Sequence, residues 1–453
     1  MKNDKSLPIL FLMEVCEGFS FYGIGIILTL FMVQFLNLNL SFALLIYGVY
    51  NGLVYITTLI GGHLCDNHIG SRKIINIGSI IMALGLFLLS YDASLTSPLT
   101  QLHSTFLFNY PEIILIISLI FTIIGAGFLR IGIASIVPEI FEISDKVESS
   151  FTMLNMALNI GMICASLILG IIVGEGNLNL YKYGFLILAS GLVILIVIYN
   201  LFRNKYLVNL KGEIVGLTPI VVNIPKKINE NIKLTKIEKK HIKAIIIIQF
   251  ISLIFFIGFE VIDSTLMFFA KDYVLNSITY LPFKVTPEMI KFIEPLGVII
   301  FSPIIISYFV SKKENYNLVS KIIMGIIVLL ISYMIFFILA IMADNGVTNI
   351  SIIFIIIMEL IRSISEILVL PIILSIVSKY APKQYLSRLM GLFYCFLAGA
   401  YTLSGFMASF FPDKNNIIIP KLFGIIPVAN FKTFSLIFIV MYLVLLIVTF
   451  VSK

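Results

Sequence analysis

Charged residues are scarce in this chain, and their scarcity excludes a soluble globular domain. Only 12% of the 453 residues are Asp, Glu, Lys or Arg, whereas a soluble domain has about 25%. Hydrophobic residues reach 60% and the mean hydropathy is +1.08, so the composition predicts a polytopic membrane protein. The net charge of +7 does not indicate a nucleic-acid partner, because Lys and Arg lie mainly in loops, where they set orientation in the membrane.

Sequence signals for catalysis and for bound metals are also missing. No H-E-x-x-H, G-x-S-x-G or Walker pattern occurs, so a membrane-bound enzyme has no support. The four cysteines lie within or beside apolar segments, and none is spaced as a metal or redox pair. We therefore expect four free thiols, no cofactor and no metal site. The cysteines are Cys16, Cys65, Cys164 and Cys395.

Long apolar runs are abundant, and each is long enough to cross a bilayer as a helix. They predict an all-α integral membrane protein with twelve transmembrane helices. The widest polar interval, 203–241, contains eight lysines and is interpreted as a basic cytoplasmic linker between two six-helix bundles, 1–202 and 242–453. The apolar runs are 7–36, 41–64, 73–91, 111–138, 150–174, 181–202, 242–271, 288–311, 317–343, 349–380, 385–411 and 428–451.

The distribution of basic residues predicts which side of the membrane each loop faces. If both termini lie inside, the inner segments hold 22 Lys and Arg and the outer segments hold 7, Lys291 among them. Inner loops of membrane proteins are enriched in these residues. We therefore expect a multi-pass protein of the inner (plasma) membrane with both termini in the cytoplasm, functioning as a monomer in the lipid bilayer.

Glu14 and Glu17 interrupt the first apolar run. Their i,i+3 spacing places both carboxyl groups on the same side of a helix. An unpaired carboxylate is costly in hydrocarbon, so this side of the helix must face a protein interior or a water-filled cavity. We interpret it as the wall of a transport pathway.

Residues 61–73, GGHLCDNHIGSRK, follow the second predicted helix. Gly62, Asp66, Gly70 and Arg72 match the G-x-x-x-D-x-x-x-G-x-R-K loop of the major facilitator superfamily, which lies between the second and third helices. The resemblance implies a conformational-switch loop on the cytoplasmic side. The alternative is an ordinary basic turn.

Three further segments resemble the proton-dependent oligopeptide transporters of the same superfamily. Residues 14–23, EVCEGFSFYG, resemble the E-x-x-E-R-F-x-Y-Y-G motif of the first helix. Residues 151–161, FTMLNMALNIG, resemble the fifth-helix segment F-x-x-x-x-x-x-x-N-x-G, and Ser365-Glu366 resembles the tenth helix. The likeness runs over about 8–410. It implies proton-coupled symport of di- or tripeptides by alternating access, with the substrate held near the bilayer midplane.

The resemblance also implies roles for particular side chains. Arg130 falls where the family has a fourth-helix lysine and would offer positive charge to a carboxylate. Tyr55 falls on a second-helix tyrosine and Tyr22 belongs to the first-helix motif, so both are pocket candidates. Glu366 would hold a substrate amine. Asn159, a polar residue in the fifth predicted helix, either lines the pocket or hydrogen-bonds a neighbouring helix.

The sequence departs from this family at several positions. The motif arginine is Gly18, a second first-helix arginine would fall at Gly25, and the eighth-helix N-P is Glu294-Pro295. Glu294 is a further candidate for holding a substrate amine, because the proline frees a carbonyl that can line a cavity. The interval 203–241 is too short and charged for the two additional helices that bacterial members usually carry.

Nine charged residues are membrane-embedded, because they lie away from the ends of the predicted helices. Glu359, Arg362 and Glu366 follow i, i+3, i+7 spacing, so they share one face and Arg362 can reach both neighbours. This face is either a neutralised triad that fixes helix packing, or Arg362 supplies the cation that the first helix lacks and bridges the two halves. The nine residues are Glu14, Glu17, Arg130, Glu260, Asp263, Glu294, Glu359, Arg362 and Glu366.

The same residues suggest how protons are coupled to transport. A carboxylate that gains or loses an arginine partner during the transport cycle can bind and release a proton. We therefore expect Glu14, Glu17 and Glu366 to carry the coupled protons, with Arg362 as the partner.

Several alternatives stay open on the sequence. Glu260, one turn before Asp263, either adds a second protonation and substrate-binding site or flanks an outer vestibule. Seven embedded acids against two arginines favour another amine-bearing or zwitterionic solute in place of a peptide. A non-transporting membrane receptor is the remaining possibility. Glu288, which follows Pro287 at a predicted helix start, is interpreted as a cap favoured by the helix dipole.

Overall fold

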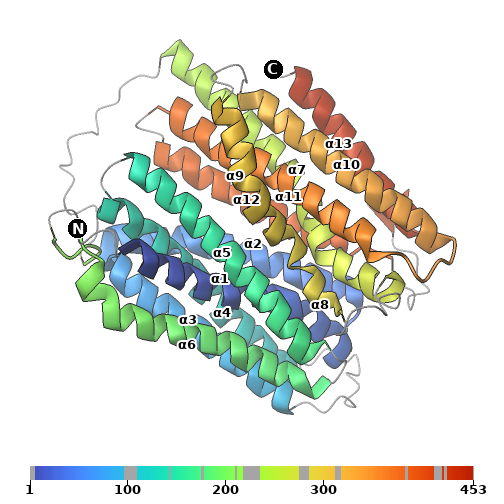
Figure 1. The fold of residues 1–453 in the computed structure, drawn as a ribbon, viewed down its shortest axis with the longest axis horizontal. Coiled ribbons are helices and arrows are strands. Elements are labelled where there is room, and N and C mark those ends of the chain that lie inside the picture. Colours follow the sequence, from blue (N-terminus) through green and yellow to red (C-terminus); the bar gives the residue numbers. More distant parts are fainter. Residues whose placement is uncertain are drawn as a thin grey trace. The chain divides into compact units, whose positions relative to one another are not determined.

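Twelve helices of 19 to 38 residues form most of the described part of the chain (Figure 1). The computed structural model describes residues 6–95, 110–141, 144–174, 178–209, 212–217, 235–274, 285–311, 318–382, 386–412, 421–422 and 426–451. The long helices are α1 Ser6–Leu30, α2 Leu40–Leu64, α3 Ser71–Leu95, α4 Tyr110–Phe141, α5 Ser144–Val173, α6 Tyr181–Tyr206, α7 Lys236–Tyr273, α9 Ile293–Ser311, α10 Leu318–Asp344, α11 Ile352–Tyr380, α12 Leu386–Ala408 and α13 Phe431–Val451. The predicted fold class and helix number are confirmed.

Ten of these helices are apolar enough over their described residues to be candidate membrane spans. The other two are α9, which has 19 residues, and α11, which carries the charged triad of Glu359, Arg362 and Glu366. The short helix α8, Pro287–Ile290, precedes α9. Strand β1, Lys421–Leu422, pairs antiparallel with β2, Ile426–Pro427.

Helix α7 starts six residues before the apolar run that predicts it. Thr235 Oγ1 accepts a hydrogen bond from the backbone N of Glu238 over 3.1 Å, and Glu238 Oε2 accepts one from the backbone N of Thr235 over 2.8 Å. This capping box satisfies two amide groups that a helix start leaves without partners. The charged first turns are therefore helical although they lie outside the apolar run.

Helix α2 continues into a π-helical turn, Cys65–Ile69, which ends at Gly70. Gly70 has a φ of +73°, a conformation that glycine adopts at little cost. The next helix, α3, starts one residue later. The second glycine of the predicted switch loop thus ends one helix and allows the next to begin.

The helices group into two compact units. Unit 1 comprises residues 1–38 and 53–232, and unit 2 comprises 39–52 and 233–453. Helix α2 therefore contributes its first part to unit 2 and its remainder to unit 1. Within unit 1, α3 packs against α4 and α6, and α1 packs against α5 and α6. Within unit 2, α10 packs against α11 and α13, α7 against α12, and α9 against α11.

The division at the basic interval 203–241 stays a prediction. Helix α6 runs to Tyr206 and α7 begins at Lys236, so helical structure extends into the interval from both sides. Its central part, 218–234, lies outside the described residues.

Candidate functional site

Unit 1 contains a buried ion pair between α1 and α4. Glu17 is fully buried, and Arg130 Nε donates to its Oε1 over 3.1 Å, with the arginine side chain 18% exposed. The guanidinium carbon lies 4.3 Å from the ring centre of Phe21 and 5.8 Å from that of Tyr55. Aromatic faces attract cations, so α1 and α2 together hold the Arg130 guanidinium in place.

One end of the Arg130 guanidinium is left for another partner. Its Nη2 atom is buried, and no acceptor in the described part of the chain hydrogen-bonds to it. A guanidinium carries five N–H donors in a planar fork that matches a carboxylate. The arrangement can therefore bind an anion without breaking the contact with Glu17.

Glu14 is also buried, and its carboxyl group lies within hydrogen-bonding reach of Glu17. Two ionised carboxylates cannot hydrogen-bond each other, because both only accept. The Oε2 atoms of both residues have no donor among the described residues. A cluster of two carboxyl groups and one guanidinium has no net charge only when the carboxyl groups share one proton. Glu14, Glu17 and Arg130 therefore have the composition of a proton-binding site.

The other binding candidates of unit 1 lie in α1 and α5. Tyr22 interacts electrostatically with Arg130, and its ring packs edge-on against Phe21 with 5.2 Å between ring centres. Asn159 donates from Nδ2 to the backbone O of Asn155 over 2.9 Å. That donor is used within α5 itself, and a role of Asn159 in binding stays a prediction.

Gly18 lies where α1 and α5 approach closely. A Cβ atom at Gly18 would lie 2.6 Å from the backbone O of Leu158, and one at Gly161 would lie 2.3 Å from the backbone O of Val15. Both distances are shorter than van der Waals contact. An arginine at position 18 would therefore have no room, and the glycine serves helix packing.

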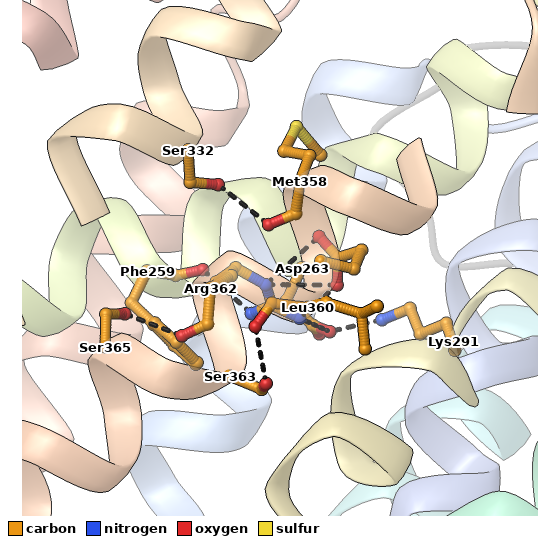
Figure 2. A network of polar contacts seen from close by, with 10 residues as sticks. Phe259, Asp263, Lys291, Ser332, Met358, Leu360, Arg362, Ser363 and Ser365 are labelled. Carbon is orange, nitrogen blue, oxygen red and sulfur yellow. Dashed lines mark hydrogen bonds and ion pairs between the residues drawn. The ribbon is translucent and has the colours of Figure 1, made fainter. Parts of the chain in front are cut away.

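Arg362 lies at the centre of a buried network in unit 2 (Figure 2). Its guanidinium donates to Glu359 over 2.7 and 3.1 Å, lies 3.6 Å from Asp263 Oδ1 and donates to the backbone O of Phe259 over 3.4 Å. Only 2% of its side chain is exposed. The network joins α7 to α11 within unit 2. The interpretation in which Arg362 bridges to the first helix stays a prediction.

Lys291 joins this network from the turn between α8 and α9 (Figure 2). Its Nζ donates to Asp263 Oδ2 over 2.7 Å, and its side chain is 6% exposed. Its place among the outer segments stays a prediction, and the structure adds that its side chain is a buried partner of Asp263. No local pattern marks such a lysine, because its carboxylate lies on another helix.

The i,i+4 spacing predicted that Glu366 contacts Arg362, but the structure gives Glu366 other partners. Arg362 was expected to reach both of its neighbours on α11, but its bonds go to Glu359 and to α7. A helical side chain points back toward the N-terminal turn, which explains why Arg362 binds the residue three positions before it. Glu366 instead lies within hydrogen-bonding reach of Glu294 and interacts with Glu260.

Arg72 of the predicted switch loop is buried and holds the chain that follows α6. Its guanidinium donates to Asn204 Oδ1 and to the backbone O atoms of Arg203 and Leu207 over 2.7 to 2.8 Å. Its Nε also donates to the backbone O of Val215. Arg72 thereby supplies donors to carbonyl groups at the end of α6 and just after it, where intrahelical hydrogen bonds run out.

The chain after α6 folds back at this point. Val208 pairs antiparallel with Ile214, and the backbone N of Gly216 donates to Glu139 Oε2 over 2.9 Å. Gly62 lies on α2, where a Cβ atom would make an ordinary 3.4 Å contact with Ile131. The side chain of Asp66 lies outside the described residues, and the role of the loop as a conformational switch stays a prediction.

Long apolar helices with ion pairs buried among them define a polytopic membrane protein of the transporter type. The chain belongs to the Major Facilitator Superfamily, whose family model matches residues 10–405. The superfamily consists of transporters.

Similar proteins narrow this assignment. The chain is 23% identical over 460 residues to dipeptide and tripeptide permease B of Salmonella typhimurium, covering 93% of this chain and 89% of that protein. It is 21% identical over 459 residues to dipeptide and tripeptide permease A of Pectobacterium carotovorum, with coverage of 93% and 86%.

Two solved structures are similar over nearly the whole chain. One is a POT family transporter in complex with 5-aminolevulinic acid, with a TM-score of 0.80, 19% identity and coverage of 99% of this chain and 97% of that one. The other is a POT family transporter in complex with a thioalcohol conjugated peptide, with a TM-score of 0.80, 19% identity and coverage of 99% and 95%. The predicted resemblance to the proton-dependent oligopeptide transporters is confirmed.

Proposed function

We propose that the protein is a secondary active transporter that moves di- and tripeptides together with protons by alternating access. The permeases it resembles are named for dipeptides and tripeptides. A peptide carries a carboxylate at one end and an amine at the other, so its transporter needs a cation for the first and an acid for the second.

The buried, unpartnered Nη2 atom of Arg130 carries this proposal. An unsatisfied buried donor costs about 1–3 kcal/mol, and a substrate carboxylate removes that cost by accepting its hydrogen bond. Tyr22 and Tyr55 lie beside the guanidinium and would shape the space around the carboxylate. Asn159 would supply a further polar contact from α5.

The substrate amine is assigned to acids of unit 2. Glu366 and Glu294 would accept hydrogen bonds from the ammonium group, with Glu260 nearby. None of the three is bonded to Arg362 or Lys291, whose hydrogen bonds go to Glu359 and Asp263.

Proton coupling follows from the composition of the unit 1 cluster. When a substrate carboxylate binds Arg130, that guanidinium must balance a second anion besides Glu17. Glu14 and Glu17 share one proton in the neutral cluster, so a second proton on this pair is needed to restore neutrality, and substrate and proton would bind together. In unit 2, Glu366 would gain or lose its proton as the amine leaves or enters, and Arg362 would keep Glu359 ionised.

The test is the pH change inside proteoliposomes that contain the purified protein, on addition of di- and tripeptides and then of single amino acids and polyamines. We expect peptide-driven proton entry that disappears in Arg130→Gln and in Glu366→Gln. Silence with peptides and a response to another amine would replace the peptide by a different amine-bearing or zwitterionic solute. Silence with all of them would favour a non-transporting receptor.

The membrane placement belongs to the same proposal. The protein would lie in the inner (plasma) membrane as a monomer with both termini cytoplasmic, because the inner segments hold 22 of the Lys and Arg residues. No chemical step on the substrate is required for this function, so the proposal includes no catalytic residue.

A further inference from the structure

Five buried or partly buried acids of unit 2 divide into two groups that differ in how their charge is balanced. The first group is a neutral quartet of two acids and two cations. Asp263 and Glu359 are bonded to Arg362 and Lys291 at distances of 2.7 to 3.6 Å. The quartet carries two positive and two negative charges, so Arg362, which also interacts electrostatically with Glu294 and Glu260, brings no excess positive charge to these neighbours.

The second group, which we name the acidic trio, is Glu260, Glu294 and Glu366. Its members come from α7, α9 and α11, three helices that pack within unit 2. Glu294 and Glu366 lie within hydrogen-bonding reach of each other, and Glu260 interacts with Glu366. The acidic trio therefore links Glu366 to two further carboxyl groups, those of Glu294 and Glu260.

Glu294 shows that the acidic trio is incomplete. The residue is 7% exposed, and its Oε1 atom is buried with no hydrogen-bond donor in the described part of the chain. Repulsion from Glu366 and Glu359 would raise the cost of leaving Glu294 ionised, against attraction by Arg362. A buried carboxylate oxygen without a donor is costly, and Arg362 gives its hydrogen bonds to Glu359 and Phe259. A donor that carries positive charge would therefore complete this place in the working cycle.

Protons alone satisfy the acidic trio less well than an ammonium group. A proton on one carboxyl supplies one donor, whereas an ammonium supplies three donors and a full charge. A peptide α-amine would balance one of the three carboxyl groups and leave two. No group of three or more His, Cys, Asp or Glu in the described ranges is arranged to hold a metal ion, which favours an organic cation.

We propose that the acidic trio is a subsite for a second positive charge, so that the transporter selects peptides with a cationic side chain over neutral peptides of the same size. This inference rests on the proposed peptide transport and specifies which class of peptides is preferred. Glu294 is the specificity-determining residue, because its Oε1 atom is the acceptor without a donor.

The test is competition against uptake of labelled Ala-Ala into proteoliposomes. The competitors are Ala-Lys and Ala-(Nε-acetyl-Lys), which share length and apolar stem and differ in the side-chain charge. We expect Ala-Lys to inhibit at a concentration about tenfold lower than the acetylated peptide, as a difference of one charge-assisted hydrogen-bonded contact allows. Equal inhibition by the two peptides in the unmodified protein would overturn the proposal without any variant.

The variant arm assigns the preference to the acidic trio. In Glu294→Gln the ratio between the two peptides should fall to about one. In the control Glu288→Gln, which removes a buried carboxyl of α8 outside the acidic trio, the ratio should stay unchanged. A ratio that persists in Glu294→Gln, with the variant monodisperse by size-exclusion chromatography, would contradict the assignment.

Failure of the proposed peptide transport gives a different result. In that case Ala-Ala is not taken up at all, and the labelled substrate is 1,5-diaminopentane. The competitors are then unlabelled 1,5-diaminopentane and its mono-acetylated form. Stronger inhibition by the unlabelled diamine than by the acetylated form, lost in Glu294→Gln, would support the cation subsite while rejecting peptides. Equal inhibition would overturn the subsite as well.

Discussion

Glu17 is fully buried on α1, and Arg130 on α4 donates to it over 3.1 Å. Removing one member of a buried ion pair leaves the other uncompensated and typically costs about 3–5 kcal/mol, whereas replacing both members is often nearly neutral. We expect Arg130→Gln to lower the apparent melting temperature, measured by size-exclusion chromatography after heating in detergent. The double variant Arg130→Gln with Glu17→Gln should recover most of that loss.

Transport by the double variant separates stability from binding. Because it lacks the guanidinium that would hold the substrate carboxylate, it should remain folded and fail to take up labelled dipeptide. Uptake at the level of the unmodified protein would show that Arg130 holds Glu17 for folding alone.

Glu288 is the second residue whose charge state can be tested by substitution. It lies in α8, before α9, and burial raises the pKa of its carboxyl above the ordinary 4.5, although its hydrogen bonds and Lys271 act in the opposite direction. The interpretation of Glu288 as a dipole-favoured anionic cap is therefore incomplete, since the buried site favours the protonated acid.

The sign of the pH effect follows from this pKa. The folded protein binds the Glu288 proton more tightly than the unfolded chain does, so the contribution to stability is full below the unfolded pKa and declines as pH rises toward the folded one. Glu288→Gln should raise the apparent melting temperature by about 1–2 °C at pH 7.5 and leave it unchanged at pH 4. The exposed acid Glu213, replaced by Gln, serves as the control without such a gain. An equal gain in melting temperature at both pH values would contradict the raised pKa of Glu288.

At the scale of elements, Gly18 and Gly399 offer a matched pair of tests. A Cβ atom at Gly18 would lie 2.6 Å from a backbone oxygen of α5, whereas one at Gly399 would meet nothing closer than Leu253 Cδ1 at 3.4 Å. We expect Gly18→Ala to destabilise the protein by about 1–3 kcal/mol through displacement of α1 from α5. Gly399→Ala should be neutral or slightly stabilising, since alanine favours a helix. Equal melting temperatures for the two variants would contradict the close helix contact.

The Arg72 contacts predict how the end of α6 behaves. Arg72 bonds Asn204 and the carbonyls of Arg203, Leu207 and Val215, so Arg72→Ala should speed hydrogen exchange of residues 212–217. Arg72→Lys should do the same, because a single ammonium cannot span the acceptors that a guanidinium fork reaches.

The neighbouring basic residue supplies the control for that measurement. Lys73 is exposed on the same turn of α3, and Lys73→Ala should leave the exchange of 212–217 unchanged. Faster exchange in Lys73→Ala as well would attribute the effect to the net charge of the loop.

At the scale of the whole molecule, the orientation in the membrane follows from charge counts. The inner segments hold 22 Lys and Arg and the outer segments hold 7, an asymmetry in favour of basic inner loops. A reporter that is active only outside the cytoplasm, fused after Lys453, should be inactive, and the same reporter inserted at Asn345, after α10, should be active. The reverse result would invert the proposed topology.

The number and approximate limits of the long helices were determined by the sequence alone, except that the structure divides the predicted run 288–311 into α8 and α9. In a bilayer every backbone polar group must be satisfied within the chain, so an apolar run of about 20 residues has almost no alternative to a helix. The main departures were charged ends, such as the first turns of α7, where the capping box of Thr235 and Glu238 extends the helix beyond its apolar part. The superfamily could also be predicted from the sequence, because its motifs are short stretches of neighbouring residues that can be recognised without the fold.

The partners of the buried charges were decided only by the tertiary structure. Arg362 binds Glu359 and Asp263, Lys291 is buried against Asp263, and Glu366 lies with Glu294. Spacing along one helix shows which residues share a face, but it does not show which cation a neighbouring helix brings to that face. Glu17 and Arg130 stand 113 positions apart in the chain, and only the packing of α1 beside α4 makes them one site.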